Sequence, residues 1–169
     1  RLRYAALEDA RQEAGCTLLA TGHHKEDQAE TVLMRLLRGA GPTGLAGILP
    51  RRGPIIRPLL HVRRAALQEY CRARSLTVCE DETNQDVTLL RNRIRHELLP
   101  QLAAAYNPEI VEALAKTALV CQREEAHFHE LLAAALAQVQ TTPDGVRLPL
   151  PLLAALPASL RSRLVRTVL

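Results

Sequence analysis

Apolar residues recur at helical spacing in three segments of the first half of the chain. These predicted helices are Arg1–Ala14, a segment from Asp27 or Gln28 to Arg38, and Val62–Arg74. The first two end at Gly15 and Gly39, and glycine commonly stops a helix. The Gly- and Pro-rich stretch Gly39–Pro54 predicts a loop. Short apolar runs predict strands at Cys16–Thr21, Ile55–Ile56 and Leu76–Cys79. This alternation is typical of an α/β fold with a parallel sheet.

The pattern changes in the second half, where helical spacing is nearly continuous. Helices are predicted over Arg91–Tyr106, Pro108–Gln138 and Pro157–Leu169. Asn107 suits the N-cap of the second of these helices, and Pro108 suits its first position. A turn is predicted at Thr141–Gly145 and a short strand at Val146–Leu148. We therefore expect a boundary near Pro100–Tyr106, between an α/β part and a helical part.

The composition is that of a globular protein with a basic surplus. Of the 169 residues, 47% are hydrophobic and 24% are charged, so disorder is not expected. A net charge of +4 and a pI of about 9.2 favour an anionic partner such as nucleic acid. The four cysteines form no C-x-x-C pair, which fits reduced thiols in a cytosol. No apolar run approaches the roughly 20 residues of a membrane span.

The stretch Gly22–Thr31 reads G-H-H-K-E-D-Q-A-E-T and joins the first predicted strand to the second predicted helix. Asp27 and Glu30 are three residues apart, so their carboxylates share one helix face. One interpretation is a solvated helix start, where the helix dipole favours negative charge. The other is a carboxylate pair that binds a cationic substrate or acts as a general base. His23 and His24 match no zinc signature, so no metal site is expected.

A second charged segment, Arg91–Pro100, reads R-N-R-I-R-H-E-L-L-P. Arg91 and Arg95 are four residues apart and share a helix face, whereas Arg93 points elsewhere. The segment is either a solvated basic face or a clamp for phosphate or carboxylate, because guanidinium groups fit both. Further arginines around the glycine-rich stretch are expected to contact RNA phosphates, and they are Arg51, Arg52, Arg57, Arg63 and Arg64.

Six motifs occur in order between Arg1 and about Pro100. They read R-x-R-Y, G-H-H-K-E-D-Q-A-E-T, L-R-G-A-G-x-x-G-L, R-P-L-L, E-D-E-T-N and R-N-R-I-R-H-E-L-L-P. In this order they resemble the bacterial tRNA(Ile)-lysidine synthetases, which belong to the ATP pyrophosphatase group with a modified phosphate loop. From Gln101 onward the resemblance rests on helical character and position.

The resemblance implies a partial Rossmann-like parallel sheet followed by a helical C-terminal region. Residues 1–100 would be the C-terminal portion of the ATP pyrophosphatase-like catalytic domain. Residues 101–169 would be a linker helix and the start of the helical substrate-binding domain. The resemblance also implies a cytoplasmic protein and leaves its oligomeric state, monomer or homodimer, open.

The implied activity is an ATP-dependent carbon–nitrogen ligation on tRNA. ATP, with Mg²⁺, adenylates the oxygen at carbon 2 of the wobble cytidine in the minor isoleucine tRNA, which has a CAU anticodon. The ε-amine of free L-lysine then attacks that carbon, and AMP leaves. The product, lysidine, pairs with adenosine, so the codon that is read changes from methionine to isoleucine.

The same resemblance places the charged residues in a lysine site. Asp27 and Glu30 would bind the lysine cation, and Glu30 would help to take the proton from its ammonium group. Arg95 and Arg91 would hold the lysine carboxylate or the phosphates of the activated intermediate. Asn92 would support that site or touch the cytidine.

Several departures from the family pattern bear on activity. The family's S-G-G-x-D-S phosphate loop does not occur, so the ATP-binding residues are not identified, although His23 and His24 would be neighbours of the nucleotide. The chain begins without methionine inside a predicted helix. We therefore expect an internal piece of a longer protein that is inactive by itself. Glu26 stands where the family more often has Asp, and Thr83 replaces a commoner Ser.

Two other interpretations stay open. The first is a different tRNA-modifying enzyme of the ATP pyrophosphatase type, such as a thiolase, but those enzymes usually carry paired cysteines and this chain has none suitably spaced. The second is a non-catalytic RNA-binding module that uses the basic segment and the long helix as its binding surface.

Overall fold

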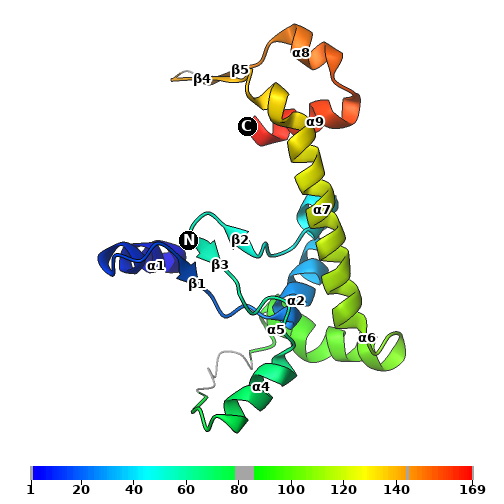
Figure 1. Cartoon of the computed structure of the whole chain (residues 1–169). Coiled ribbons are helices and arrows are strands. Elements are labelled where there is room, and N and C mark those ends of the chain that lie inside the picture. The colour runs from blue at the N-terminus through cyan, green and yellow to red at the C-terminus, as the bar shows by residue number, and fades with distance from the viewer. Residues whose placement is uncertain (1, 79–85, 144, 169) are drawn as a thin grey trace. The chain divides into compact units, whose positions relative to one another are not determined.

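The computed structural model describes residues 2–78, 86–143 and 145–168, which form two compact units (Figure 1). The first unit is Arg1–Gln122 and the second is Arg123–Leu169. The division falls within the long helix α7 (Ile110–Leu136). None of the helices in the described part of the chain is both long enough and apolar enough to cross a membrane.

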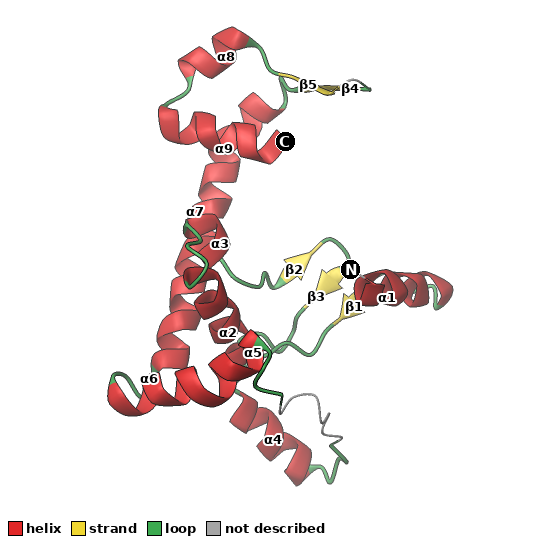
Figure 2. Cartoon of the chain, turned by 180° about the vertical axis from the view of Figure 1, so that it is seen from behind, coloured by secondary structure: helices red, strands yellow, loops and turns green. Residues whose placement is uncertain are grey.

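Unit 1 contains a three-stranded sheet in the order β1-β3-β2 (Figure 2). β1 (Leu19–Ala20) pairs in parallel with β3 (Ile55–Ile56). β2 (Arg51–Arg52) pairs antiparallel with β3 across a two-residue turn. Gly53 in that turn has a φ of 58°, a conformation that glycine adopts without a steric penalty. The parallel pair with helical segments between its strands confirms the predicted α/β class.

Some of the predicted strands and loops are wrong in detail. The strand expected over Cys16–Thr21 shortens to the two residues of β1, and Ala20 is exposed rather than buried. The stretch expected to be loop contains β2 and a one-turn helix, α3 (Pro42–Leu45), which Pro42 starts with a preset φ. Leu76–Val78 forms no strand, because nothing among the described residues buries this run. Cys79 and the E-D-E-T-N motif lie outside the described residues.

The predicted helices of the first half are present with shifted ends. α1 spans Leu2–Glu13 and stops before Gly15, whose φ is 62°. α2 spans Lys25–Leu36 and so begins before Asp27. The cause is His24, which takes the N-cap position and donates its backbone N–H to Asp27 Oδ2 at 2.9 Å. α4 spans Arg64–Ala73.

The helix expected over Arg91–Tyr106 contains a π turn. α5 (Leu90–Arg93) runs into η2 (Ile94–Leu98), where the N–H of the following residue donates to the Ile94 carbonyl five residues back. α6 (Leu99–Ala105) continues the helix. We attribute the π turn to Pro100, which has no N–H and whose ring would clash with the carbonyl four residues earlier.

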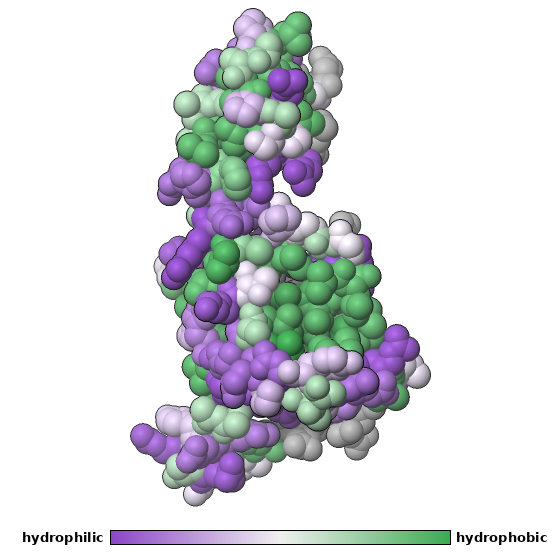
Figure 3. Space-filling view, turned by 90° about the vertical axis from the view of Figure 1, so that its right-hand side faces the viewer, coloured by the Kyte–Doolittle hydropathy of each residue, from purple (hydrophilic) through white to green (hydrophobic). Residues whose placement is uncertain are grey.

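Buried apolar side chains of unit 1 gather where α2 meets α5, η2, α6 and α7. The cluster consists of Ala29, Val32, Leu33, Ile94, Leu99, Leu114 and Ala118. This packing fixes α5 and η2 against α2, so it determines which polar residues of these helices meet. Apolar side chains also remain at the surface, where Figure 3 shows a broad hydrophobic area on unit 1, and Leu37 is 61% exposed.

Unit 2 is built around the C-terminal part of α7. β4 (Gln140–Thr142) and β5 (Gly145–Arg147) form an antiparallel hairpin. The strand expected over Val146–Leu148 is shifted by one residue, and Thr141, Thr142 and Gly145, expected in a turn, belong to the two strands. α8 (Leu150–Ala155) and α9 (Ala158–Val168) follow. Leu132, Ala135 and Leu164 form the buried core of this unit. At its edge the Arg163 guanidinium lies 3.9 Å from the Phe128 ring centre and pairs with Glu125.

The glycine-rich connection between α2 and β2 is anchored by polar side chains of helices. Gln28 accepts from Ile48 N–H at 2.6 Å and donates to the Ile48 carbonyl at 3.0 Å. Arg35 Nη1 donates to the carbonyls of Gly44 and Gly47 at 2.7 and 3.0 Å. Gln122 Nε2 donates to the carbonyls of Ala46 and Ile48, at 2.7 and 3.0 Å. The backbone of this connection is therefore fixed by protein contacts.

Replacing Gly47 by alanine tests this anchoring. Its φ is 64°, and an added Cβ would lie 2.6 Å from Gln28 Oε1. We expect Gly47→Ala to lower the free energy of unfolding by about 2–4 kcal/mol, measured by urea denaturation. Gly39→Ala is the matched control, because its φ is 75° but its Cβ meets nothing within 4 Å. It should lose about 1 kcal/mol. Equal losses in the two variants would contradict the anchoring.

Candidate active site

The centre of the candidate site is Glu30, which the core places beneath the helix formed by α5 and η2. Its side chain is fully buried, at 0% exposed. Arg95 Nε lies 2.6 Å from Glu30 Oε1, and Arg95 Nη2 lies 3.1 Å from Oε2. Arg91 Nε lies 2.7 Å from Oε2. Both oxygens of Glu30 therefore accept charge-assisted hydrogen bonds, and the two arginines share a helix face as predicted.

Asp27 belongs both to this cluster and to the helix cap. Its Oδ1 accepts from Arg91 Nη2 at 2.9 Å and from Arg95 Nη2 at 3.4 Å. Its Oδ2 accepts the His24 N–H. Asp27 can do both because it is the third residue of α2, where a side chain folds back towards the helix start. We call Asp27, Glu30, Arg91 and Arg95 the four-charge cluster, because it holds two carboxylates and two guanidinium groups.

Exposure increases outward through the four-charge cluster. The side chain of Glu30 is 0% exposed, that of Asp27 13%, that of Arg95 20% and that of Arg91 38%. The hydrogen bonds with Glu30 raise the pKa of Arg95 above its ordinary value, although burial acts in the opposite direction. Arg91 is therefore the member that a ligand reaches most readily, and Glu30 is the member that holds the arginines.

A third acid, Glu26, connects the start of α2 to the start of α4. Its Oε2 accepts the Arg64 N–H at 2.8 Å and lies 3.1 Å from His24 Nδ1. Its Oε1 lies 3.1 Å from Arg63 Nε. Burial raises the pKa of Glu26, but the contacts with His24 and the Arg64 N–H outweigh it and hold the pKa at about 2. His24 Nε2 also lies 3.6 Å from Asp27 Oδ2, so this imidazole stands between two carboxylates.

The first turn of α7 reaches the same region through Glu112. Lys25 Nζ lies 2.8 and 3.0 Å from the two Glu112 oxygens, and Arg63 Nη1 lies 3.3 Å from one of them. The hydrogen bond from Lys25 lowers the pKa of Glu112. Sequence reasoning gave neither Lys25 nor Glu112 a role. They are 87 residues apart, and no motif marks Glu112 as a partner.

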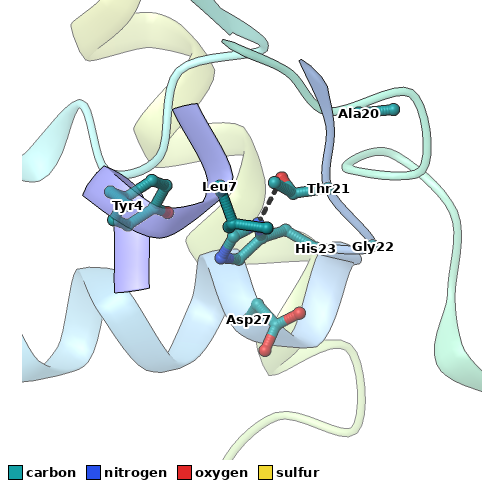
Figure 4. Close-up of a pocket in the computed structure, with 7 residues that line it drawn as sticks. All are labelled: Tyr4, Leu7, Ala20, Thr21, Gly22, His23 and Asp27. Carbon is teal, nitrogen blue, oxygen red and sulfur yellow. Dashed lines mark hydrogen bonds between the residues drawn. The ribbon is translucent and has the colours of Figure 1, made fainter. Parts of the chain in front are cut away.

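Two cavities adjoin the four-charge cluster. The first, of about 410 Å³, lies between α1, the end of β1 and the start of α2, and its lining includes Tyr4, Thr21, His23 and Asp27 (Figure 4). His23 Nδ1 lies 2.9 Å from Thr21 Oγ1, which orients the imidazole at its wall. Tyr4 belongs to the R-x-R-Y motif, which is the sequence signal for this wall.

The second cavity, of about 240 Å³, combines a charged wall with an apolar one. Glu30, Arg95, Arg64 and Glu26 contribute charge, and α6 and the first turn of α7 contribute apolar side chains such as Leu99. The histidines that sequence analysis places beside the nucleotide therefore divide between the cavities, His23 in the first and His24 in the second.

The remaining predicted residues have varied surroundings. Asn92 is buried and donates to the Asp86 carbonyl at 2.9 Å, so it holds the turn before α5. The expectation that Arg57 belongs to a cationic surface is wrong, because its side chain is buried and donates to the Leu49 carbonyl at 2.8 Å. Arg51, Arg52 and Arg64 are exposed. Among the described residues, no group of three or more His, Cys, Asp or Glu side chains is placed to hold a metal ion.

Comparison with protein families shows the family of this chain. The profile of the PP-loop domain family matches residues 1–102. The chain belongs to this family. The match covers β1, α2, α5 and η2, and therefore every member of the four-charge cluster.

Individual relatives extend the similarity beyond the PP-loop match. The tRNA(Ile)-lysidine synthase of Solibacter usitatus is 44% identical over 168 residues, which cover 98% of this chain and 38% of that protein. The proteins of the same name from Geobacter sulfurreducens and Symbiobacterium thermophilum are 41% and 43% identical, over 98% of this chain and 36% and 37% of theirs. The chain thus spans less than two fifths of the length of these relatives.

Removing the charge of Glu30 tests the four-charge cluster. Glu30→Gln leaves Arg95 and Arg91 without their buried counter-ion, so the free energy of unfolding should fall by about 3–5 kcal/mol, measured by urea denaturation. Glu8→Gln is the matched control, because Glu8 pairs with Arg11 on the surface of one helix at 2.6 Å. That variant should lose much less. A Glu30→Gln loss no larger than the control's would show that the cluster does not stabilise the fold.

The low pKa of Glu26 predicts a pH dependence of stability. A carboxyl whose pKa falls from 4.5 to about 2 on folding stabilises the fold above pH 4.5. This contribution is lost as the pH falls from about 4.5 to about 2, because the unfolded chain takes up the proton first.

Urea denaturation at several pH values between these limits measures the effect. Glu26→Gln should flatten the fall in stability across the window, and Glu69→Gln, at an exposed position of α4, should keep the parental slope. An unchanged slope in Glu26→Gln would contradict the assignment.

Proposed function

We propose that this chain forms part of a tRNA(Ile)-lysidine synthase. The observation that carries the proposal is 41–44% identity to proteins of that name across 98% of the chain. The proposed substrates are ATP with Mg²⁺, free L-lysine and the minor isoleucine tRNA with a CAU anticodon, and the proposed location is the cytoplasm. Residues 1–100 would belong to the catalytic domain, and residues 101–169 would be a linker helix and the start of a helical substrate-binding domain.

The proposed reaction makes one carbon–nitrogen bond at the cost of one ATP. The cytidine oxygen at carbon 2 attacks the α-phosphorus of ATP, and pyrophosphate leaves. The lysine ε-amine then attacks carbon 2, and the carbon–oxygen bond breaks as AMP departs with that oxygen. Lysine arrives as an ammonium ion, so protons must be accepted as the new bond forms. The site must therefore attract a cation and also stabilise phosphate oxygens.

The four-charge cluster supplies both kinds of group. We assign Asp27 to the lysine ammonium, because it lines the 410 Å³ cavity and retains some exposure. Arg91, the most exposed member, would pair with the lysine carboxylate or a phosphate of the activated intermediate. Glu30 would hold Arg95 in position and supply the negative charge that favours the cation. Proton acceptance would fall to the carboxylate pair, and Asn92 would support the site by holding the turn before α5.

Substrate binding would exchange partners within the cluster. Asp27 Oδ1 and Glu30 Oε2 each accept from both arginines, so an ammonium ion that binds either oxygen would displace an arginine, which can then turn to an anionic group. Lysine carries both a cation and a carboxylate. It can therefore replace one internal ion pair with two pairs of its own, which keeps the buried charge balanced.

The complete enzyme with and without Asp27→Asn tests the function. It is incubated with ATP, labelled lysine and the CAU-anticodon isoleucine tRNA, and lysine in the tRNA is counted and identified as lysidine by nucleoside mass spectrometry. The parent should form lysidine, and Asp27→Asn should lower the rate by roughly 100-fold or more. Asp9→Asn, at an exposed position of α1, should remain active.

The outcomes separate the candidate functions. tRNA binding without any lysidine in the parent enzyme would favour a non-catalytic RNA-binding module. A different modified nucleoside in the tRNA would favour another enzyme of the ATP pyrophosphatase type. Near-parental turnover by Asp27→Asn would remove Asp27 from the site while leaving the activity itself intact.

A further inference from the structure

Helix α4 has a surface that the four-charge cluster does not use. α4 is described in full, and none of its ten residues is buried. Figures 1 and 2 show it extending away from α2 and α5 of the same unit. It is attached at its start: Glu26 accepts the Arg64 N–H, and just before the helix the Val62 carbonyl accepts the Lys25 N–H at 3.0 Å. Most of its length therefore faces outward.

A polar row runs along one side of this helix. Arg64, Gln68 and Arg72 are four residues apart in turn, so they lie on one face. Arg64 and Arg72 are separated by about 12 Å along the axis, at about 1.5 Å per residue. All three are exposed, and neither arginine forms an ion pair with a carboxylate among the described residues. Within the described part of the chain, both cationic heads are available to an anion.

The two ends of the row reach two different cavities. Arg64 lines the 240 Å³ cavity together with Glu30 and Arg95 of the four-charge cluster. At the other end Gln68 and Arg72 line a separate open cavity of about 300 Å³. Cys71, Leu76 and Val78 complete its lining, which gives it apolar surface beside an amide and a guanidinium group. The row thus connects the candidate active site to a second concave site on α4.

The chemistry of this second site fits a nucleobase attached to a phosphate. An unpaired base presents an apolar face and a polar edge, which suit an apolar floor and an amide such as Gln68. The adjoining phosphate suits the Arg72 guanidinium. In a stacked strand, with about 3.4 Å per nucleotide, the roughly 12 Å between Arg64 and Arg72 corresponds to three or four nucleotides.

We propose that the row Arg64–Gln68–Arg72 guides the anticodon loop of the substrate tRNA, with one unpaired base of the loop in the cavity lined by Gln68, Cys71, Arg72, Leu76 and Val78. This rests on the proposed function, because it assumes that a tRNA wobble nucleotide enters at the Arg64 end. The site on α4 holds the loop three or four nucleotides from the reacting base, and so it fixes which nucleotide is presented to the four-charge cluster.

A pair of charge reversals on α4 tests the proposal in the complete enzyme. Arg72→Glu places a carboxylate on the row. Arg74→Glu is the matched control, because it makes the same change two residues further on, on a different face, where Arg74 lies 5.5 Å from the Tyr70 ring centre. For each variant we would measure kcat and KM for tRNA, KM for lysine, and tRNA affinity at several salt concentrations.

We expect Arg72→Glu to raise KM for tRNA about tenfold while changing kcat and KM for lysine less than about twofold. The slope of log affinity against log salt should also shrink by about 0.7, the value for one single-strand phosphate contact. Arg74→Glu should stay within about threefold of the parent in KM for tRNA. A photoreactive side chain at position 68 should crosslink to a nucleotide of the anticodon loop.

Equal effects of the two reversals would overturn the proposal, since that result reports only the general charge of α4. Parental tRNA binding by Arg72→Glu, or crosslinks confined to nucleotides outside the anticodon loop, would overturn it as well. Lysidine formation by the parent enzyme keeps these outcomes separate from the proposed function. A parent that makes no lysidine refutes the function, whereas an active parent with indistinguishable variants refutes only the role of the row.

Discussion

A carboxylate with no exposure, held by two guanidinium groups, is the interaction on which unit 1 depends. Burying Glu30 without partners would cost far more than a domain of this size can offset, so Arg91 and Arg95 have to meet it. The apolar cluster makes that meeting obligatory, because Ala29 and Leu33 flank Glu30 on α2 while Ile94 lies between the two arginines in sequence. Hydrophobic packing and ion pairing therefore specify the same docking of the two helices.

The charges of the four-charge cluster that could bind a substrate are paired with one another in the free protein. The four-charge cluster has no net charge, so the folded chain does not carry an isolated buried ion before the substrate arrives. Its members differ in exposure, from the buried Glu30 to the partly exposed Arg91. The partners of Arg91 can therefore change more easily than those of Glu30. Around it, Glu26 and Glu112 attach the starts of α4 and α7 to the start of α2. Hydrogen bonds of these two carboxylates therefore hold α4 and α7, which are distant in sequence, to the N-terminus of α2.

The sequence predicted much of this and missed the rest for identifiable reasons. Helix existence followed from apolar periodicity, and the shared face of Arg91 and Arg95 followed from their spacing. The pairing of those arginines with Glu30 did not, because local spacing carries no information on which distant helix faces which. The prediction for Arg57 was wrong because the sequence does not show whether an arginine is exposed or is buried and bonded to a carbonyl. The π turn escaped notice because Pro100 can be accommodated in more than one way.

The two hydrogen bonds between the Gln28 side chain and the Ile48 backbone limit how the length of the connection between α2 and β2 can change. One side-chain amide satisfies both backbone groups of Ile48, as a neighbouring strand would. A residue inserted or deleted between Gly44 and Ile48 would move the carbonyls and the N–H that Arg35 and Gln28 bind. Near Gly39 and Gly41 the glycine Cβ positions meet nothing within 4 Å, so an inserted residue there can loop into solvent. The connection between α2 and β2 therefore tolerates a change of length near Gly39 and Gly41, but not between Gly44 and Ile48.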